Sequence, residues 1–157
     1  RNLKTNPDEY FYLGTKYQLE VRNNQKNLIE VENKLYIASS SDKYIKTYLE
    51  SWYKQQARKI ILERVHHYAQ ISGSQYKSVS LTSATTRWGS CSSQKNLNFN
   101  YRLVMLPETM INYVIIHELC HLKEMNHSNR FSQLVATYFP DYKKIRKEMR
   151  SLHMEVD

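Results

Sequence analysis

The chain has 157 residues, 41% of them hydrophobic, with only three glycines and three prolines. This composition fits a single domain over residues 1–157 and excludes a disordered or linker-rich protein. No apolar run reaches the roughly 20 residues that a membrane span needs, and no secretory signal is visible. We therefore expect a cytoplasmic monomer without a membrane partner, with allowance for a leading segment before Arg1. The net charge of +8 favours anionic partners, nucleic acid or nucleotides among them.

Residues 10–38 alternate in the manner of β-strands. Tyr10 and Tyr12 precede Gly14, and alternation resumes from Tyr17 to Val21, which predicts a hairpin. Residues 28–31 and 35–37 predict a second hairpin around 32–34. Together these segments predict a small antiparallel β-meander.

Residues 42–70 contain no glycine or proline and carry apolar residues at helical spacing from Ile45 to Tyr68. Ser41 or Asp42 could cap the start of this helix, and Ser72-Gly73 would end it. The pattern predicts one long amphipathic helix.

Strand character returns after residue 78. Val79 and Leu81 alternate, a turn-rich stretch follows from residue 88 to 96, and apolar residues alternate again from 97 to 103. Pro107 then opens a helix that we expect to continue to about Met125. Further helices are predicted from near Ser128 and from residue 140 toward 152. The last one carries the densest basic group, and on a helix such a run is usually a solvated face: Lys143, Lys144, Arg146, Lys147 and Arg150.

The helix after Pro107 contains the pattern H-E-x-x-H, at His117, Glu118 and His121. Four residues on a helix turn about 400°, so the two imidazoles lie about 40° apart and can bind one ion. Glu118 lies about 100° round from His117, where its carboxylate can take a proton from a water on that ion. A zinc site with Glu118 as general base is therefore expected. The alternative is a pair of histidines satisfied by ordinary hydrogen bonds.

His127 is the candidate third ligand. On a continuous helix it would lie about 15 Å along the axis from His117, so the helix must end first and the chain must turn back. Asn126 tolerates the left-handed conformation that this turn needs, and Ser128 can cap the next helix. Three histidines and an open fourth position are typical of catalytic zinc.

For the other polar residues and the cysteines, the sequence gives weaker evidence of a role at the metal site. Glu124 is either a carboxylate at the rim of the site or plain surface. His66, His67 and His153 are expected to have no metal role. Cys91 and Cys120 form no C-x-x-C pair and predict reduced, partly buried thiols.

The stretch from Arg87 to Cys91 predicts a tight turn at Gly89, with Trp88 in the core. The strand after it, from Leu97 to Arg102, could line the cleft and pair with an extended substrate. Arg87, Asn100 and Arg102 are possible substrate-binding residues, and either arginine could stabilise a developing negative charge.

These motifs resemble the YgjP-like metal-dependent hydrolases, zincin-type proteins related to the SprT-like and WLM metallopeptidases. The resemblance is carried by R-W-G-S-C-S at residues 87–92, by L-x-x-L-P ending at Pro107, and by H-E-L-C-H-L-K-E-M-N-H-S at residues 117–128, followed by Phe131. It covers roughly residues 80–142 closely. One departure is Ser132, where the family often has a large aromatic. The resemblance implies that His117, His121 and His127 bind Zn²⁺ and that Glu118 is catalytic.

The expected fold is α+β and zincin-like: an N-terminal antiparallel β-meander, a long helix, a mixed sheet, the metal-binding helix and C-terminal helices. The favoured function is a zinc-dependent metallopeptidase that acts on peptides. A metal-dependent nucleoside triphosphate pyrophosphatase is the alternative, because the basic residues could bind phosphates. A non-catalytic nucleic-acid-associated module is the third hypothesis.

Overall fold

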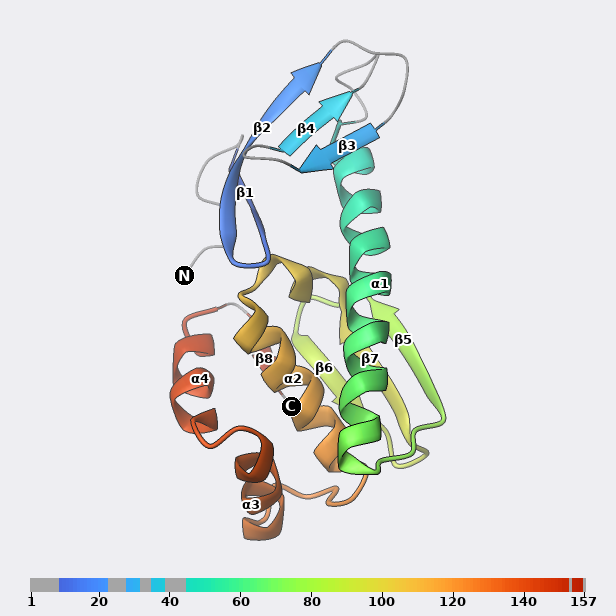
Figure 1. The fold of residues 1–157 in the computed structure, drawn as a ribbon, viewed down its shortest axis with the longest axis vertical. Helices are drawn as coiled ribbons and strands as arrows, with labels where there is room; N and C mark the ends of the chain where they lie inside the picture. The colour runs from blue at the N-terminus through green and yellow to red at the C-terminus, as the bar shows by residue number, and fades with distance from the viewer. Residues whose placement is uncertain (1–8, 23–27, 32–34, 39–44, 153, 157) are drawn as a thin grey trace.

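The computed structural model describes residues 9–22, 28–31, 35–38, 45–152 and 154–156 (Figure 1). Two four-stranded sheets and a set of helices make up an α+β fold. Helix α1 runs from the N-terminal sheet to the far end of the second sheet. Within the described ranges, no helix is both long enough and apolar enough to cross a membrane.

The N-terminal sheet consists of two hairpins, as predicted, but they do not join as a meander. Its strands are β1 (Glu9–Tyr12), β2 (Thr15–Arg22), β3 (Leu28–Val31) and β4 (Leu35–Ala38), in the order β1-β2-β4-β3. Because β4 pairs with β2 in parallel, the sheet is mixed and the prediction of an antiparallel meander is wrong on this point. The sequence of β4 has no charged residue, which suits an inner strand, whereas β3 contains Glu30 and lies at the edge.

Helix α1 (Ile45–Ser72) confirms the long amphipathic helix. Every fourth residue faces the core: Leu49, Tyr53, Ala57, Ile61, Val65 and Ala69. The predicted stop at Gly73 is confirmed. Gly73 has φ +64°, its N–H bonds the Gln70 carbonyl at 3.3 Å, and the Ser74 N–H bonds the Ala69 carbonyl at 2.9 Å. The proposed caps Ser41 and Asp42 lie outside the described residues.

The second sheet is mixed, as predicted. Strands β5 (Ser78–Thr82), β6 (Arg87–Cys91), β7 (Asn96–Asn100) and β8 (Glu155–Val156) lie in the order β5-β7-β6-β8. Strand β6 is antiparallel to β7, whereas the other two pairings are parallel. The tight turn predicted at Gly89 is wrong, because residues 87–91 form β6 and the turn follows at Ser92–Lys95. Tertiary packing overrides the low strand propensity of Gly89 and Ser90 here.

The alternation predicted as a strand up to Leu103 ends earlier than expected. The Asn100 side chain accepts a hydrogen bond from the Arg102 N–H at 2.9 Å and thereby caps a 3-10 helix, η2 (Tyr101–Met105). Tyr101, Leu103 and Val104 are buried in this helix. Their apolar character therefore reflects burial and not strand alternation.

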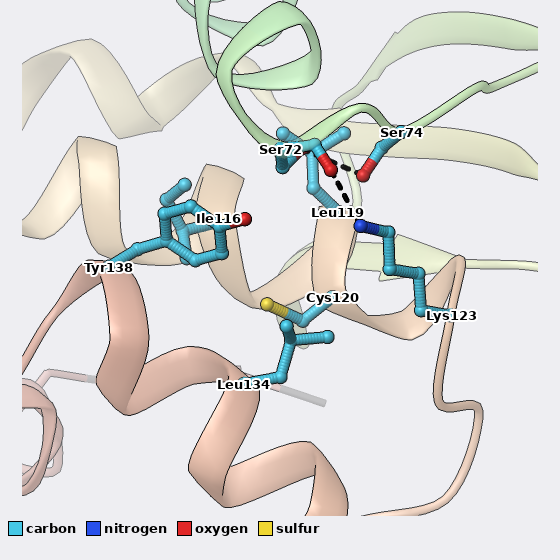
Figure 2. A pocket seen from close by; sticks show the side chains of 8 residues that line it. All are labelled: Ser72, Ser74, Ile116, Leu119, Cys120, Lys123, Leu134 and Tyr138. Carbon is cyan, nitrogen blue, oxygen red and sulfur yellow. Dashed lines mark hydrogen bonds between the residues drawn. The ribbon is translucent and has the colours of Figure 1, made fainter.

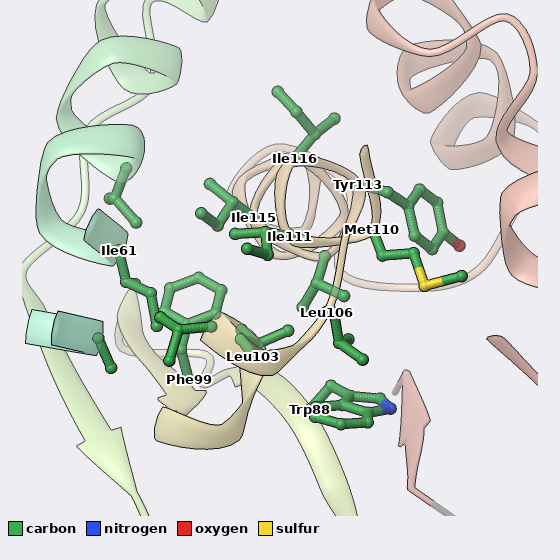
Figure 3. Packing of buried hydrophobic residues seen from close by; sticks show 14 of the residues in the cluster. Ile61, Trp88, Phe99, Leu103, Leu106, Met110, Ile111, Tyr113, Ile115 and Ile116 are labelled. Atoms are coloured by element: carbon green, nitrogen blue, oxygen red, sulfur yellow. The ribbon is translucent and has the colours of Figure 1, made fainter. Parts of the chain in front are cut away.

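Helix α2 (Glu108–His121) is surrounded by other elements. It contacts α1, β6, α3 (Asn129–Tyr138) and α4 (Tyr142–Met149), and nearly every residue from Met110 to His121 is buried. Figure 3 shows Ile111 and Ile115 packed over Phe99 and Leu103, with Trp88 in the same core, as predicted for Trp88. The helix ends at His121 and not near Met125, a shortening that shapes the site described next.

Candidate metal centre

His117 and His121 are one turn apart on α2 and share a face of that helix. Both are buried, with exposed fractions of 6% and 3%, and their ring centroids are 4.9 Å apart. Two imidazoles at this spacing on a rigid, buried helix can point at the same ion.

The end of α2 brings His127 back to these two residues. The N–H groups of Lys123 and Glu124 both bond the Cys120 carbonyl, at 3.1 and 2.9 Å, and close the last turn. Ser128 caps α3 as predicted, because its hydroxyl accepts a hydrogen bond from the Phe131 N–H at 3.3 Å. The left-handed conformation predicted for Asn126 is wrong: among the described non-glycine residues, only Leu13 and Lys95 have positive φ. At the two ends of this turn, Leu122 is in the right-handed helical conformation and Ser128 is extended.

The three imidazoles form a compact group of nitrogen ligands. Their ligand atoms all lie within 4.8 Å of one another, and Nε2 of His121 is 3.1 Å from Nε2 of His127. Two nitrogens at tetrahedral positions about 2.0–2.1 Å from one zinc ion are about 3.3 Å apart. The geometry and the donor set therefore fit a zinc ion held by three histidines.

The backbone of Glu124 orients one of these rings, a role that sequence reasoning missed. The Glu124 carbonyl oxygen lies 3.1 Å from Nδ1 of His121. A proton on Nδ1 bonds this carbonyl and leaves the lone pair of Nε2 for a metal. The early end of α2 is the feature that could have predicted this role. In a continuous helix the Glu124 carbonyl would accept a backbone hydrogen bond from the next turn of the helix and could not bond His121.

Glu118 is fully buried on the same helix and packs against strand β6. A Cβ atom placed on Gly89 would lie 3.1 Å from Cγ and 3.2 Å from Oε2 of Glu118. Glycine at position 89 therefore lets the backbone of β6 come directly beside this carboxylate. The arrangement combines three imidazoles with a buried carboxylate next to the first of them in sequence.

The centre opens to solvent at His127, which is exposed. The neighbouring Met125 has 48% of its surface exposed. His117 and His121 are thus buried on α2, whereas the loop between α2 and α3 carries the solvent-exposed ligand candidate.

Of the possible substrate-binding residues, Arg87 is exposed and lines a hollow of about 300 Å³ with residues of β5, β6 and β7. The side chains of Asn100 and Arg102 contact the segment before β6. Asn100 is buried and donates to the Ala84 carbonyl, and Arg102 donates to the Ser83 carbonyl at 3.3 Å. These contacts give Asn100 and Arg102 a structural task in positioning β6.

The flank of α2 away from the histidines packs against the end of α1 (Figure 2). Lys123 Nζ donates to the Ser72 carbonyl at 2.5 Å, and the hydroxyls of Ser72 and Ser74 are 2.7 Å apart. Cys120 lies in the same contact between the end of α1 and α2. Burial raises the pKa of its thiol to about 12. Cys91 and Cys120 are both free thiols, as predicted, and the high pKa of Cys120 does not suit a nucleophile.

Comparison with known proteins adds an independent line of argument. A family model described as a YgjP-like metallopeptidase domain matches residues 2–152. A search of curated proteins gave no match. Among solved structures, the chain is similar to the metallopeptidase zymogen abylysin of Pyrococcus abyssi, with 25% identity and a TM-score of 0.56 over 62% of this chain and 99% of that one.

A second similar structure is the metallopeptidase zymogen jannalysin of Methanocaldococcus jannaschii. The identity is 22% and the TM-score 0.51, over 58% of this chain and 94% of that one, and this likeness concerns the fold alone. The resemblance inferred from the motifs is thereby confirmed over almost the whole sequence. The chain belongs to the YgjP-like family of metallopeptidase domains.

Proposed function

We propose that this protein is a zinc-dependent peptidase in which His117, His121 and His127 hold the ion and Glu118 is the general base. The observation that carries the proposal is the group of three imidazoles, with ligand atoms within 4.8 Å of one another, and the fully buried carboxylate of Glu118 at the residue after His117. Family membership supports a metal-dependent peptidase. Zinc is argued from the donor set, because three histidines and an open side are typical of catalytic zinc sites.

When bound, zinc supplies a Lewis acid that acidifies a water molecule and polarises a substrate carbonyl. The chain's own residues do the proton transfer. Glu118 accepts the proton of the attacking water and returns it to the nitrogen of the leaving amine. Its burial excludes bulk water, and the contact with Gly89 holds the carboxylate against the sheet.

Strand β6 supports a peptide as the substrate. It lies beside Glu118 through Gly89, and its outer edge pairs with β8 only at Arg87 and Gly89. In the part of the chain that the structure describes, no strand pairs with that edge at Ser90 and Cys91. An extended peptide can add to such an edge by main-chain hydrogen bonds, which would bring a peptide carbonyl toward the site.

The test compares peptides with nucleotides as substrates. The zinc-loaded protein is incubated with an unfolded protein and a peptide library, and separately with nucleoside triphosphates, alongside Glu118→Gln. We expect cleavage of peptides, and a loss of about 10²–10⁴-fold in kcat for Glu118→Gln at unchanged zinc content. Glu108→Gln is the matched control, because Glu108 is an exposed residue of the same helix whose carboxylate pairs with Arg64 at 2.7 Å.

Two outcomes would contradict the proposal. Peptide cleavage by Glu118→Gln at the wild-type rate would remove Glu118 from the mechanism. Release of pyrophosphate from nucleotides that Glu118→Gln abolishes, without any peptide cleavage, would replace the peptidase by a nucleotide hydrolase.

A further inference from the structure

The ring of Phe131, in the first turn of α3, touches all three histidines of the candidate metal centre. It stacks on His121 with centroids 4.3 Å apart and an interplanar angle of 19°. It meets His117 and His127 edge to face, at 4.9 and 5.1 Å, with interplanar angles of 77° and 79°. Phe131 is only 5% exposed, so one buried ring forms a common wall behind the three imidazoles.

We propose that Phe131 is a positioning residue of the metal centre, which holds the three imidazoles in the arrangement that binds one ion. The inference rests on the proposed function, because it takes His117, His121 and His127 as the ligands. It goes beyond that function by assigning to an apolar residue, which offers no ligand atom, the task of setting the geometry and affinity of the site.

The need for such a residue follows from where His127 lies. His117 and His121 are held by a buried helix, whereas His127 is an exposed residue of a loop. Fixing the rotamer of an exposed side chain costs conformational entropy each time an ion binds. A ring packed against His127 in advance reduces that cost, and the affinity for the ion rises accordingly.

The local sequence explains how Phe131 reaches this position. The Ser128 hydroxyl accepts the Phe131 N–H at 3.3 Å, which starts α3 directly after His127. Val135, one turn further along, is also buried, so the same face of α3 packs onto the core and carries the Phe131 ring with it. The cap therefore sets His127 and Phe131 relative to each other, and helix packing sets both relative to α2.

A role in the core alone and a role in positioning predict different results. Loss of a core ring lowers the stability of the fold, whereas loss of a positioning ring also changes the ligand field of the bound ion. Phe139 is a matched control, because it is a partly buried ring directly after α3, with its centroid 6.4 Å from that of the Tyr113 ring. Phe139→Leu therefore removes a similar ring from the same region.

The experiment titrates the metal-free protein with Co²⁺ against a competing chelator, recording the visible d–d absorption, for wild type, Phe131→Leu, Phe131→Tyr and Phe139→Leu. Far-ultraviolet circular dichroism and the Tm of each variant report on folding. For folded Phe131→Leu we expect a Co²⁺ affinity about 10–100-fold lower than wild type, together with altered d–d bands. Phe131→Tyr, which keeps a ring, should restore both, and Phe139→Leu should change neither.

An unchanged affinity and spectrum in Phe131→Leu would overturn the inference, and so would an equal loss in Phe139→Leu. If Phe131→Leu does not fold, Phe131→Met, which fills the space without a flat ring, takes its place under the same criteria. Wild-type protein that binds no Co²⁺ would overturn the metal centre and this inference together. The wild-type titration thus separates failure of the proposed function from failure of the role of Phe131.

Discussion

Gly89 shows how a single missing side chain shapes the candidate site. A Cβ at this position would approach Glu118 to 3.1 Å at Cγ and 3.2 Å at Oε2. The neighbours on both sides are fixed, because Glu118 is on a buried helix and Gly89 is paired with Phe99 in the sheet. Neither element can move away without disturbing the core.

Gly89→Ala should therefore displace the Glu118 carboxylate and reduce peptidase activity by about 10–100-fold, at a stability cost of about 1–3 kcal/mol. Steady-state kinetics and thermal unfolding measure the two effects. Ser80→Ala, at an exposed residue of β5, is the control and should keep its activity. Full activity in Gly89→Ala would show that the close approach to Glu118 has no catalytic consequence.

His127 is the exposed member of the three histidines and the one that a loop carries. His127→Ala should remove one of the three nitrogen ligands. Loss of a residue that only hydrogen-bonds a ligand lowers metal affinity by about 10–100-fold, and we expect the zinc affinity of His127→Ala to fall by more than this. Metal content after dialysis against a chelator measures this effect. His67→Ala, at an exposed histidine of α1, should retain its zinc. Unchanged zinc content in His127→Ala would point to another third ligand.

At the scale of elements, the ends of α1 and α2 hold each other in place. Lys123, just after α2, donates to the Ser72 carbonyl at the last residue of α1. A cation at the C-terminal end of a helix interacts favourably with its dipole. This contact lies on the flank of α2 away from the histidines, so it helps to fix the end of α2 without taking part in metal binding.

Lys123→Met should lower the free energy of unfolding by about 0.5–1 kcal/mol and leave the zinc affinity unchanged. Urea unfolding with metal titration checks both values. The control is Lys143→Met, at an exposed lysine of α4, which should have little effect on either. A loss of zinc affinity in Lys123→Met would contradict this prediction and would mean that the contact with Ser72 also positions the histidines.

At the scale of the whole molecule, the N-terminal hairpin is attached to the body that carries the site. The N–H groups of Leu13 and Gly14 bond the carbonyls of Val104 and Met105, at 2.7 and 3.1 Å. A Cβ on Gly14 would lie 2.8 Å from Cα of Pro107, and the φ of Gly14 is +82°. The close packing and the left-handed backbone conformation both require glycine at this position. The turn of the hairpin thus rests on the residue that begins α2.

Tyr53 makes a second connection, because its hydroxyl donates to the Phe11 carbonyl at 2.6 Å. Burial, followed by the nearby Tyr10, raises the pKa of Tyr53 above its ordinary value of 10.0. Since the folded state keeps this phenol neutral, its contribution to stability is complete below pH 10 and is lost as the pH rises toward the folded-state pKa.

Tyr53→Phe should therefore cost about 1 kcal/mol at neutral pH, through loss of the hydrogen bond. Above about pH 10 the variant should lose less stability than wild type, because the phenol that titrates is gone. Unfolding by urea at several pH values measures both effects. The control is Tyr76→Phe, at a half-buried tyrosine outside the hairpin contact. Parallel pH curves for wild type and Tyr53→Phe would contradict this assignment.

Much of the architecture follows from local sequence. The long helix was predictable because α1 buries every fourth residue from Leu49 to Ala69 and is followed by a glycine with positive φ. The cap of α3 at Ser128 was predictable from its hydroxyl and from the need to bring His127 back. The three histidines were predictable as a group because the spacing of His117 and His121 is dictated by helix geometry.

Other features depend on contacts between distant residues, which no local pattern contains. Glycine favours turns, but Gly89 lies in a strand because it pairs with Phe99 of β7 and packs against Glu118 of α2. The parallel pairing of β2 with β4 depends on where the second hairpin docks, and Asn100 ends β7 because its side chain caps η2.

For the candidate site, the groups that are available can be read from the amino-acid sequence: three imidazoles and one carboxylate, at spacings that a helix and a turn can bring together. Their orientation comes from packing between distant segments. The Glu124 carbonyl faces His121, the Phe131 ring contacts all three imidazoles, and the backbone of Gly89 lies against Glu118. This division arises because the type of a ligand is a property of a single residue, whereas its orientation depends on contacts between elements that are far apart along the chain.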